Sequence, residues 1–136
     1  MSNITPVNDK IPLGQVGEIT ASVIEILGLS VAPGTPILIG ESNIKHMMNK
    51  HPNEYIRYGA YIHTIVSAPD YVGLNPGDGS IEYVKEFAIN GDYVKVAVRV
   101  ANSGEYFARS IYTLNATKVQ SFIFNGTLKR LTTKSE

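Results

Sequence analysis

The chain has 136 residues, 43% of them apolar, and its 12 basic and 12 acidic residues give a formal net charge of zero. This length and composition suit one domain with its own core, and any attraction for a polyanion must come from a local patch. The absence of cysteine excludes disulfides and thiolate metal sites. We see no signal-peptide pattern and no apolar run of membrane-spanning length, so we expect a cytoplasmic protein.

The two ends of the chain are polar. Residues 1–15, which include Pro6 and Pro12, indicate an extended lead-in, and residues 129–136 indicate a polar tail. Between them, residues 16–128 are expected to form a single α+β domain, because helical patterns come first and strand patterns follow.

The first expected element is a helix. Apolar residues recur at helical spacing between Val16 and Leu27, and Gly28 stands where a helix C-cap belongs. Pro33 to Pro36 then break the chain, and residues 37–39 are long enough only for a short strand or a buried connector.

Two further helices are expected before the strands. Ser42 suits the N-cap of a helix over residues 43–50, and Pro52 suits the first position of a helix that runs to about residue 66. A short strand over residues 70–74 and a turn over residues 75–79 complete this part of the chain.

Three strand patterns then follow one another, over residues 80–89, 93–101 and 105–114. They are rich in β-branched and aromatic residues, and Asn90-Gly91 is typical of a two-residue hairpin turn. These patterns predict a C-terminal antiparallel meander within a sheet of about four strands, on which the N-terminal helices pack. After the meander, Asn115 suits the N-cap of a last short helix, with Gly126 just beyond its end.

Two-residue turns would fix the register and therefore the side chains that share a face. If Ile89 pairs with Asp92 and Asn102 with Glu105, one face is nearly all apolar and is interrupted by Lys85, Arg109 and Thr113. A buried cation is costly unless it is paired or lines a wet cleft. Lys85 and Arg109 therefore indicate either a functional cleft or side chains that reach the sheet margin or a carboxylate.

The opposite face of the meander carries more polar side chains, and we expect it to be partly solvated. It includes Arg99, Ser110 and Tyr112, and the assumed register places Glu86 opposite Lys95 and Glu82 opposite Arg99. The simplest interpretation of these charges is two exposed cross-strand ion pairs.

His46 and His51 are the clearest candidates for acid–base chemistry, because histidine exchanges protons near neutral pH. Five residues of helix separate their directions by about 140°, whereas two zinc-binding histidines on one face need a spacing of three or four. We therefore expect no metal site. The structural alternative is a solvated His46 and a half-buried His51 at a helix end.

The order of these segments resembles a known nuclease superfamily. The segments are Ile44-Lys45-His46, Lys50-His51-Pro52, Asn75-Pro76, Ser80 to Glu86, Val96 to Val100 and Ala108 to Tyr112. Together they look like the phage-borne branch of the barnase/EndoU/colicin/RelE-like (BECR-fold) nucleases, over about residues 36–128.

The resemblance implies a toxin-like, mobile-element-associated endoribonuclease that needs no metal or other cofactor. Such enzymes cleave RNA by attack of the 2′-hydroxyl on the adjacent phosphodiester, which leaves a cyclic phosphate. The resemblance implies that His46 or His51 transfers protons, that Arg109 and Lys85 bind the phosphate, and that Thr113 donates a hydrogen bond. If the cleft lies on the opposite face, Arg99, Ser110 and Tyr112 become the better candidates, and the Glu82/Arg99 pair becomes of interest.

The expected partner is RNA, with tRNA as one candidate, and we expect no membrane partner. An immunity protein or a larger phage polypeptide is a further candidate partner. The alternative function is a non-catalytic interaction module of a phage or mobile-element protein. An open cleft with basic walls favours the nuclease, whereas carboxylates that neutralise Lys85 and Arg109 in a filled cleft favour the module.

Overall fold

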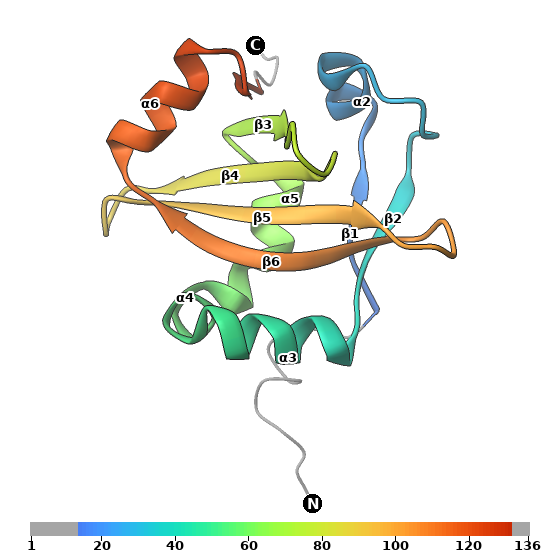
Figure 1. Cartoon of the computed structure of the whole chain (residues 1–136), viewed down its shortest axis with the longest axis horizontal. Coiled ribbons are helices and arrows are strands. Elements are labelled where there is room, and N and C mark those ends of the chain that lie inside the picture. The colour runs from blue at the N-terminus through green and yellow to red at the C-terminus, as the bar shows by residue number, and fades with distance from the viewer. Residues whose placement is uncertain (1–13, 132–136) are drawn as a thin grey trace, which may run out of the picture.

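The computed structural model describes residues 14–131, which form an α+β fold around one seven-stranded sheet (Figure 1). The strand order is β1-β2-β6-β5-β4-β3-β7, with β2 parallel to β6 and the other neighbours antiparallel. The predicted α+β class is confirmed. The predictions of about four strands and of clearly N-terminal helices are wrong, because both ends of the described chain add strands and helices alternate with strands.

The segment expected to form the first helix is split between a strand and a helix. It forms β1 (Gly14–Ile19) and α2 (Ala21–Leu27), and β1 pairs with β2 (Thr35–Ile39). Thr20 begins α2 by accepting a hydrogen bond from the Val23 N–H at 3.3 Å. Val16 and Ile19 are buried in the core but belong to a strand. Their helix-like spacing therefore does not indicate a helix here. Residues 1–13 of the expected lead-in lie outside the described residues.

The helices that follow lie close to the predicted ranges. They are α3 (Glu41–Lys50), α4 (Pro52–Tyr58), the single 3₁₀ turn η1 (Gly59–Tyr61) and α5 (Ile62–Ser67). Pro52 occupies the first turn of α4, as predicted. α3 starts before the expected position, because the Asn43 Oδ1 atom accepts a hydrogen bond from the Gly40 N–H at 2.8 Å and thereby closes its first turn.

The remaining strands are β3 (Tyr71–Leu74), β4 (Ile81–Phe87), β5 (Asp92–Val100), β6 (Tyr106–Leu114) and β7 (Leu128–Arg130). β7 pairs with β3 where we expected a polar tail from residue 129, and residues 132–136 lie outside the described part. Gly73 permits this pairing, since a Cβ atom there would lie 2.0 Å from the Thr127 carbonyl oxygen.

The main core lies between one face of the sheet and the helices behind it in Figure 1, most clearly α5. On this covered face, Tyr83, Val96 and Ile111 are fully buried against residues such as Ile62 and Ile65. On the other face, α6 (Ala116–Phe124) covers one end of the sheet through Val119 and is capped by Asn115, as predicted. We call the rest of that face the open face. No helix within residues 14–131 combines the length and apolar character of a membrane span.

The turn between β4 and β5 is longer than predicted. Phe87 pairs with Asp92, and both Asn90 and Gly91 donate backbone hydrogen bonds to the Phe87 carbonyl oxygen. Only Gly91 has a positive φ, so the type I′ geometry expected for Asn-Gly is not formed. The two-residue shift preserves the predicted faces but changes the opposed pairs: Glu82 faces Ala97 rather than Arg99.

A β-bulge in β6 corrects the predicted position of Arg109. Ala97 pairs with Ser110, whereas its neighbour Val98 pairs with Ala108, so Arg109 is an extra residue with no partner in β5. The prediction that Arg109 shares the covered face with Lys85 is therefore wrong. The small, fully buried Ala108 takes the core position, and the guanidinium of Arg109 reaches the open face without the cost of burying a charge.

Candidate active site

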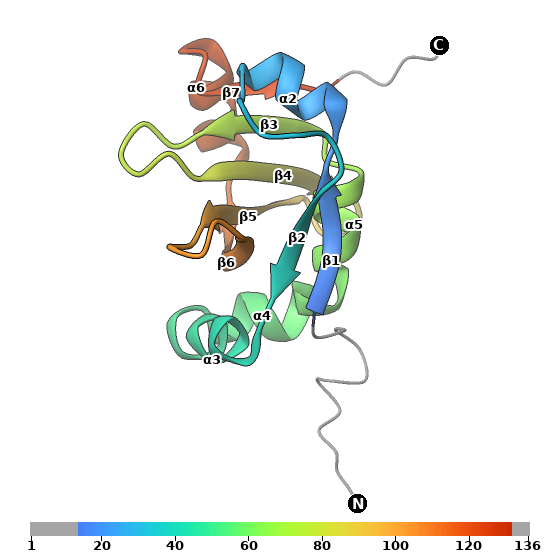
Figure 2. The same cartoon turned by 90° about the vertical axis from the view of Figure 1, so that its right-hand side faces the viewer.

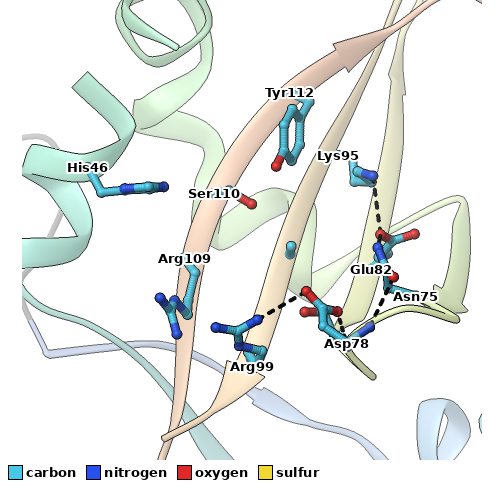
Figure 3. A pocket seen from close by; sticks show the side chains of 11 residues that line it. His46, Asn75, Asp78, Glu82, Lys95, Arg99, Arg109, Ser110 and Tyr112 are labelled. Atoms are coloured by element: carbon cyan, nitrogen blue, oxygen red, sulfur yellow. Dashed lines mark hydrogen bonds and ion pairs between the residues drawn. The ribbon is translucent and has the colours of Figure 1, made fainter. Parts of the chain in front are cut away.

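A polar cleft lies on the open face and is lined by residues of α3 and of the β3–β4 loop (Figure 3). Figure 2 shows these two elements on opposite sides of strands β5 and β6. The cavity volume of the cleft is about 240 Å³. The lining residues come from α3, the loop and strands β4 to β6: His46, Asn75, Asp78, Ser80, Glu82, Lys95, Ala97, Arg99, Arg109, Ser110 and Tyr112. Helix, loop and sheet thus contribute titratable, cationic and hydroxyl side chains to one solvent-accessible space.

Two arginines on neighbouring strands supply fixed positive charge to the cleft. Arg99 of β5 pairs with Asp78, with 3.1 Å between Nη1 and Oδ2. Arg109 is exposed on the bulge and makes no ion pair with any residue from 14 to 131. The guanidinium of Arg109 is therefore available to an anion, and Arg99 has further N–H donors beside the one that Asp78 uses.

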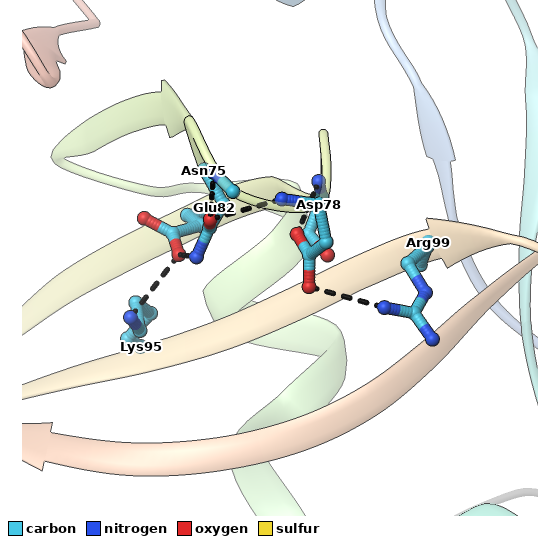
Figure 4. Close-up of polar contacts among 7 residues, drawn as sticks. Asn75, Asp78, Glu82, Lys95 and Arg99 are labelled. Carbon is cyan, nitrogen blue, oxygen red and sulfur yellow. Dashed lines mark hydrogen bonds and ion pairs between the residues drawn. The ribbon is translucent and has the colours of Figure 1, made fainter.

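A largely buried ion pair lies on the side of the cleft opposite α3. Figure 4 shows its contacts. Lys95 Nζ lies 3.1 Å from Oε2 of Glu82, and their side chains are only 16% and 8% exposed. The Asn75 Nδ2 group donates a second hydrogen bond to the same carboxylate oxygen at 3.1 Å. These contacts hold Glu82 in place and leave its other oxygen without a described hydrogen bond.

The β3–β4 loop is ordered by its own side chains. The Asn75 Oδ1 atom accepts a hydrogen bond from the Gly77 N–H at 2.7 Å, and Asp78 Oδ1 accepts one from the Ser80 N–H at 2.9 Å. Hydrogen bonds from Ser80, followed by the charge of Arg99, hold the pKa of the Asp78 carboxyl below its usual value. Asp78 is therefore ionised at neutral pH and fixes both the loop and Arg99.

Tyr112 stands between a histidine and a lysine. The rings of His51 and Tyr112 meet edge-on, with 4.4 Å between their centroids, and Lys95 Nζ lies 4.8 Å from the Tyr112 ring centroid. His51, half-buried between α3 and α4, therefore touches a residue of the cleft without lining the cleft itself.

His46 reaches the cleft from α3, which runs alongside β6 (Figure 1). Ile44 and Met47 of the same helix are buried in the core and anchor this position. The exposed imidazole of His46 points across β6 toward Ser110 (Figure 3). A solvated His46 was expected as the structural alternative, and the residue is solvated, but it also faces the cleft.

Five of the eight candidate residues from the sequence line this cleft: His46, Arg99, Arg109, Ser110 and Tyr112. The other three do not. Lys85 Nζ donates a hydrogen bond to the Ala68 carbonyl oxygen at 2.9 Å, and Thr113 pairs with Val94 on the covered face. His51 contacts Tyr112 from outside.

No site role was predicted from the sequence for Asn75, Asp78 or Lys95. The first two lie in a loop for which the sequence predicts only a turn, although loops on a rigid sheet often carry functional side chains. Lys95 was expected in an exposed pair with Glu86, but the corrected register brings it to the buried Glu82 instead. The concentration of Asn and Asp in residues 75–78 was the available signal.

One family model matches residues 14–121, from β1 into α6. The chain belongs to this family, phage-Barnase-EndoU-ColicinE5/D-RelE like nuclease3. The predicted family is thereby confirmed, and the matched range contains every residue that lines the cleft. No curated protein and no solved structure matches the chain.

Membership of this nuclease family supports a nuclease function with nucleic acid as the substrate. The cleft offers what a phosphodiester requires: two guanidinium groups for the anionic phosphate, an imidazole, a carboxylate and hydroxyl groups. Within residues 14–131, no three His, Asp or Glu side chains lie close enough together to hold a metal ion.

Proposed function

We propose that this protein is a metal-independent endoribonuclease that cleaves RNA by attack of a 2′-hydroxyl on the adjacent phosphodiester. The observation that carries the proposal is the position of His46 and Glu82 on opposite sides of the cleft, with Arg99, Arg109 and Ser110 between them (Figure 3). The attacking and leaving oxygens lie on opposite sides of phosphorus in an in-line displacement. A base and an acid on opposite walls suit that geometry.

Each wall supplies one proton transfer in this mechanism. The Glu82 carboxylate accepts the proton of the attacking 2′-hydroxyl, and His46 donates a proton to the leaving 5′-oxygen. The O–P bond to the 2′-oxygen forms as the bond to the 5′-oxygen breaks, which leaves a 2′,3′-cyclic phosphate and a free 5′-hydroxyl. A cyclic product and a requirement for the 2′-hydroxyl are therefore expected.

The arginines stabilise the charge that develops on phosphorus oxygens. Arg109 presents its guanidinium without a carboxylate partner among residues 14–131, and Asp78 fixes the orientation of Arg99. Cations and donors that are already oriented toward the reacting group need no reorganisation when charge develops there. Removing one such donor lowers kcat by about 10²- to 10³-fold. Ser110 and Tyr112 add hydroxyl donors on the floor of the cleft.

The proposed site differs from the first assignment from the sequence. Lys85 and Thr113 leave the proposed machinery because they lie away from the cleft. His51 becomes a positioning residue that acts through Tyr112. The open-face candidates, Arg99, Ser110 and Tyr112, take their place beside His46 and Arg109.

The decisive experiment measures cleavage of labelled total RNA and tRNA in excess chelator. We expect cleavage by the wild type and a loss of about 10²- to 10⁴-fold in His46→Ala, as for removal of a general acid. Arg109→Ala should also lose activity. Lys129→Ala, which removes an exposed cation from β7, is the matched control and should cleave normally.

The same experiment tests the alternative of a non-catalytic interaction module. That alternative predicts a filled cleft with neutralised cations, whereas the cleft holds about 240 Å³ and Arg109 has no ion pair with a described residue. If the folded wild type cleaves no RNA, the nuclease proposal fails and the module is favoured. The tRNA target, an immunity protein and a larger phage polypeptide stay predictions.

A further inference from the structure

A second cavity adjoins the polar cleft and shares both of its arginines. Its volume is about 280 Å³, and besides Arg99 and Arg109 it is lined by Phe107 of β6 and by Gly40 and Asn43 at the start of α3. We call it the Phe107 cavity. If the phosphate binds at the arginines, the next nucleotide of the same chain is within reach of this space.

The β-bulge that exposes Arg109 also determines where the Phe107 ring lies. Regular alternation from Ile111 through Arg109 would place Phe107 on the covered face. The extra residue changes that alternation, and Phe107 instead pairs with Arg99, whose side chain lies on the open face. The ring is half-buried and borders a cavity rather than the core.

We infer that the Phe107 cavity is a subsite for one nucleobase next to the scissile phosphate, with the base stacked on the Phe107 ring. This inference rests on the proposed ribonuclease function. Aromatic rings are the common platform for unpaired bases, and an adjacent guanidinium adds a second planar, cationic surface. The cavity lies just below the range of about 300–1,000 Å³ for drug-sized ligands, which suits one base rather than a larger group.

Asn43 gives this subsite a polar edge. Its Oδ1 atom accepts the hydrogen bond from the Gly40 N–H, but its Nδ2 group makes no hydrogen bond with a described residue. That amide group can donate to an acceptor on a base edge. Ring stacking by Phe107 thus supplies affinity for any base, and Asn43 supplies a preference among bases.

The test uses short 2′-deoxy oligonucleotides that carry 2-aminopurine at each position in turn. They lack the 2′-hydroxyl and so cannot react by the proposed mechanism, and stacking quenches 2-aminopurine fluorescence. Wild type is compared with Phe107→Leu, which loses the ring, and Phe107→Tyr, which keeps it. Phe124→Leu removes an exposed phenylalanine, 93% accessible, from α6 and is the matched control.

We expect quenching at one oligonucleotide position in wild type, Phe107→Tyr and Phe124→Leu. Phe107→Leu should lose that quenching and bind about 5- to 150-fold more weakly, the usual range for one base–aromatic stack. Equal quenching and affinity in all four proteins would overturn the subsite, and so would failure of the folded wild type to bind. Binding does not depend on cleavage, so an inactive wild type would refute the ribonuclease proposal separately.

Discussion

The guanidinium of Arg99 and the carboxylate of Asp78 lie 3.1 Å apart. A carboxylate of the protein therefore already binds one nitrogen of the guanidinium that faces the proposed phosphate site. Asp78 is held from its other side by the Ser80 N–H. The pair therefore orients Arg99 and also places a negative charge close to the path of a polyanion.

Asp78→Asn should bind RNA more tightly. The amide oxygen can keep the hydrogen bond from Ser80, but the variant loses the negative charge that competes for Arg99. We expect a several-fold lower KM and a salt dependence of log KM that is steeper by about one, as for one more phosphate contact. Glu25→Gln on the exposed surface of α2 changes the net charge equally and should leave both quantities unchanged. An unchanged KM in Asp78→Asn would show that Asp78 does not compete with substrate.

Glu82→Gln tests the proposed role of Glu82 as a base. The side chain keeps its shape and its contact with Asn75, but it loses the charge that pairs with Lys95 and can no longer take the 2′-hydroxyl proton. We expect kcat to fall by about 10²–10⁴. Glu86→Gln changes an exposed carboxylate of the same strand outside the cleft and should keep full activity. Equal activity of the two variants would remove Glu82 from the mechanism.

Deletion of Arg109 should abolish cleavage and leave the fold intact. Because this residue has no partner in β5, its removal converts the bulge into a regular strand and leaves the pairs of Ala108 and Ser110 available. We expect circular dichroism and cooperative unfolding like those of Arg109→Ala, together with a similar loss of activity. An unfolded deletion variant would mean that the bulge stabilises the sheet itself.

Stability should decline in alkali because of two buried tyrosines. Within the described residues, neither the Tyr55 nor the Tyr83 hydroxyl has a hydrogen-bond partner. Burial raises the pKa of Tyr55 to about 12 and raises that of Tyr83 further. The unfolded chain ionises near the ordinary tyrosine pKa of about 10 and then binds fewer protons than the folded chain, so the free energy of unfolding falls as pH rises above that value.

Denaturant titrations from pH 8 to pH 12 measure this decline. The double variant Tyr55→Phe/Tyr83→Phe should flatten it, whereas Tyr61→Phe, which removes the hydroxyl of a tyrosine that is 47% exposed, should not. An identical pH profile in the wild type and the double variant would contradict the assignment.

Gly73→Ala should detach β7 from the sheet. The added Cβ atom would lie 2.0 Å from the Thr127 carbonyl oxygen, and backbone cannot move aside as a flexible side chain can. We expect a loss of about 1–3 kcal/mol, typical of forced overpacking. Faster hydrogen exchange in β7 and at the adjoining edge of β3 would locate the damage, and unchanged exchange there would refute it.

Local chemistry determined the elements that the sequence predicted well. Asn115 caps α6, Gly28 ends α2 in the left-handed conformation, and Pro52 begins α4, because each depends on its immediate neighbours. β1 and β7 were missed for a different reason. Each is short, and its pairing with a distant strand outweighs the local pattern.

Some residues that line the candidate cleft could be chosen from the sequence, but their assembly into one cleft could not. His46 and Arg109 were chosen for their chemistry, and both line the cleft. The sequence could not reveal the bulge at Arg109. The bulge avoids the cost of burying the Arg109 cation and allows Ala108 to be buried in its place, and this balance depends on the packed structure. Nor could the sequence reveal that the buried Lys95–Glu82 pair depends on a turn two residues longer than expected.

The parallel pairing of β2 with β6 determines when the site can exist. Ile37 of β2 pairs with Tyr106 of β6, and most of the described sequence lies between these two residues. Helix α3, which carries His46, directly follows β2. Contacts between such distant segments form late, after the intervening chain has closed a long loop. A chain still emerging from the ribosome therefore carries His46 well before β6 can complete the cleft. If the proposed ribonuclease activity holds, the protein stays inactive beside its own messenger until synthesis has passed β6, the last strand of the candidate site.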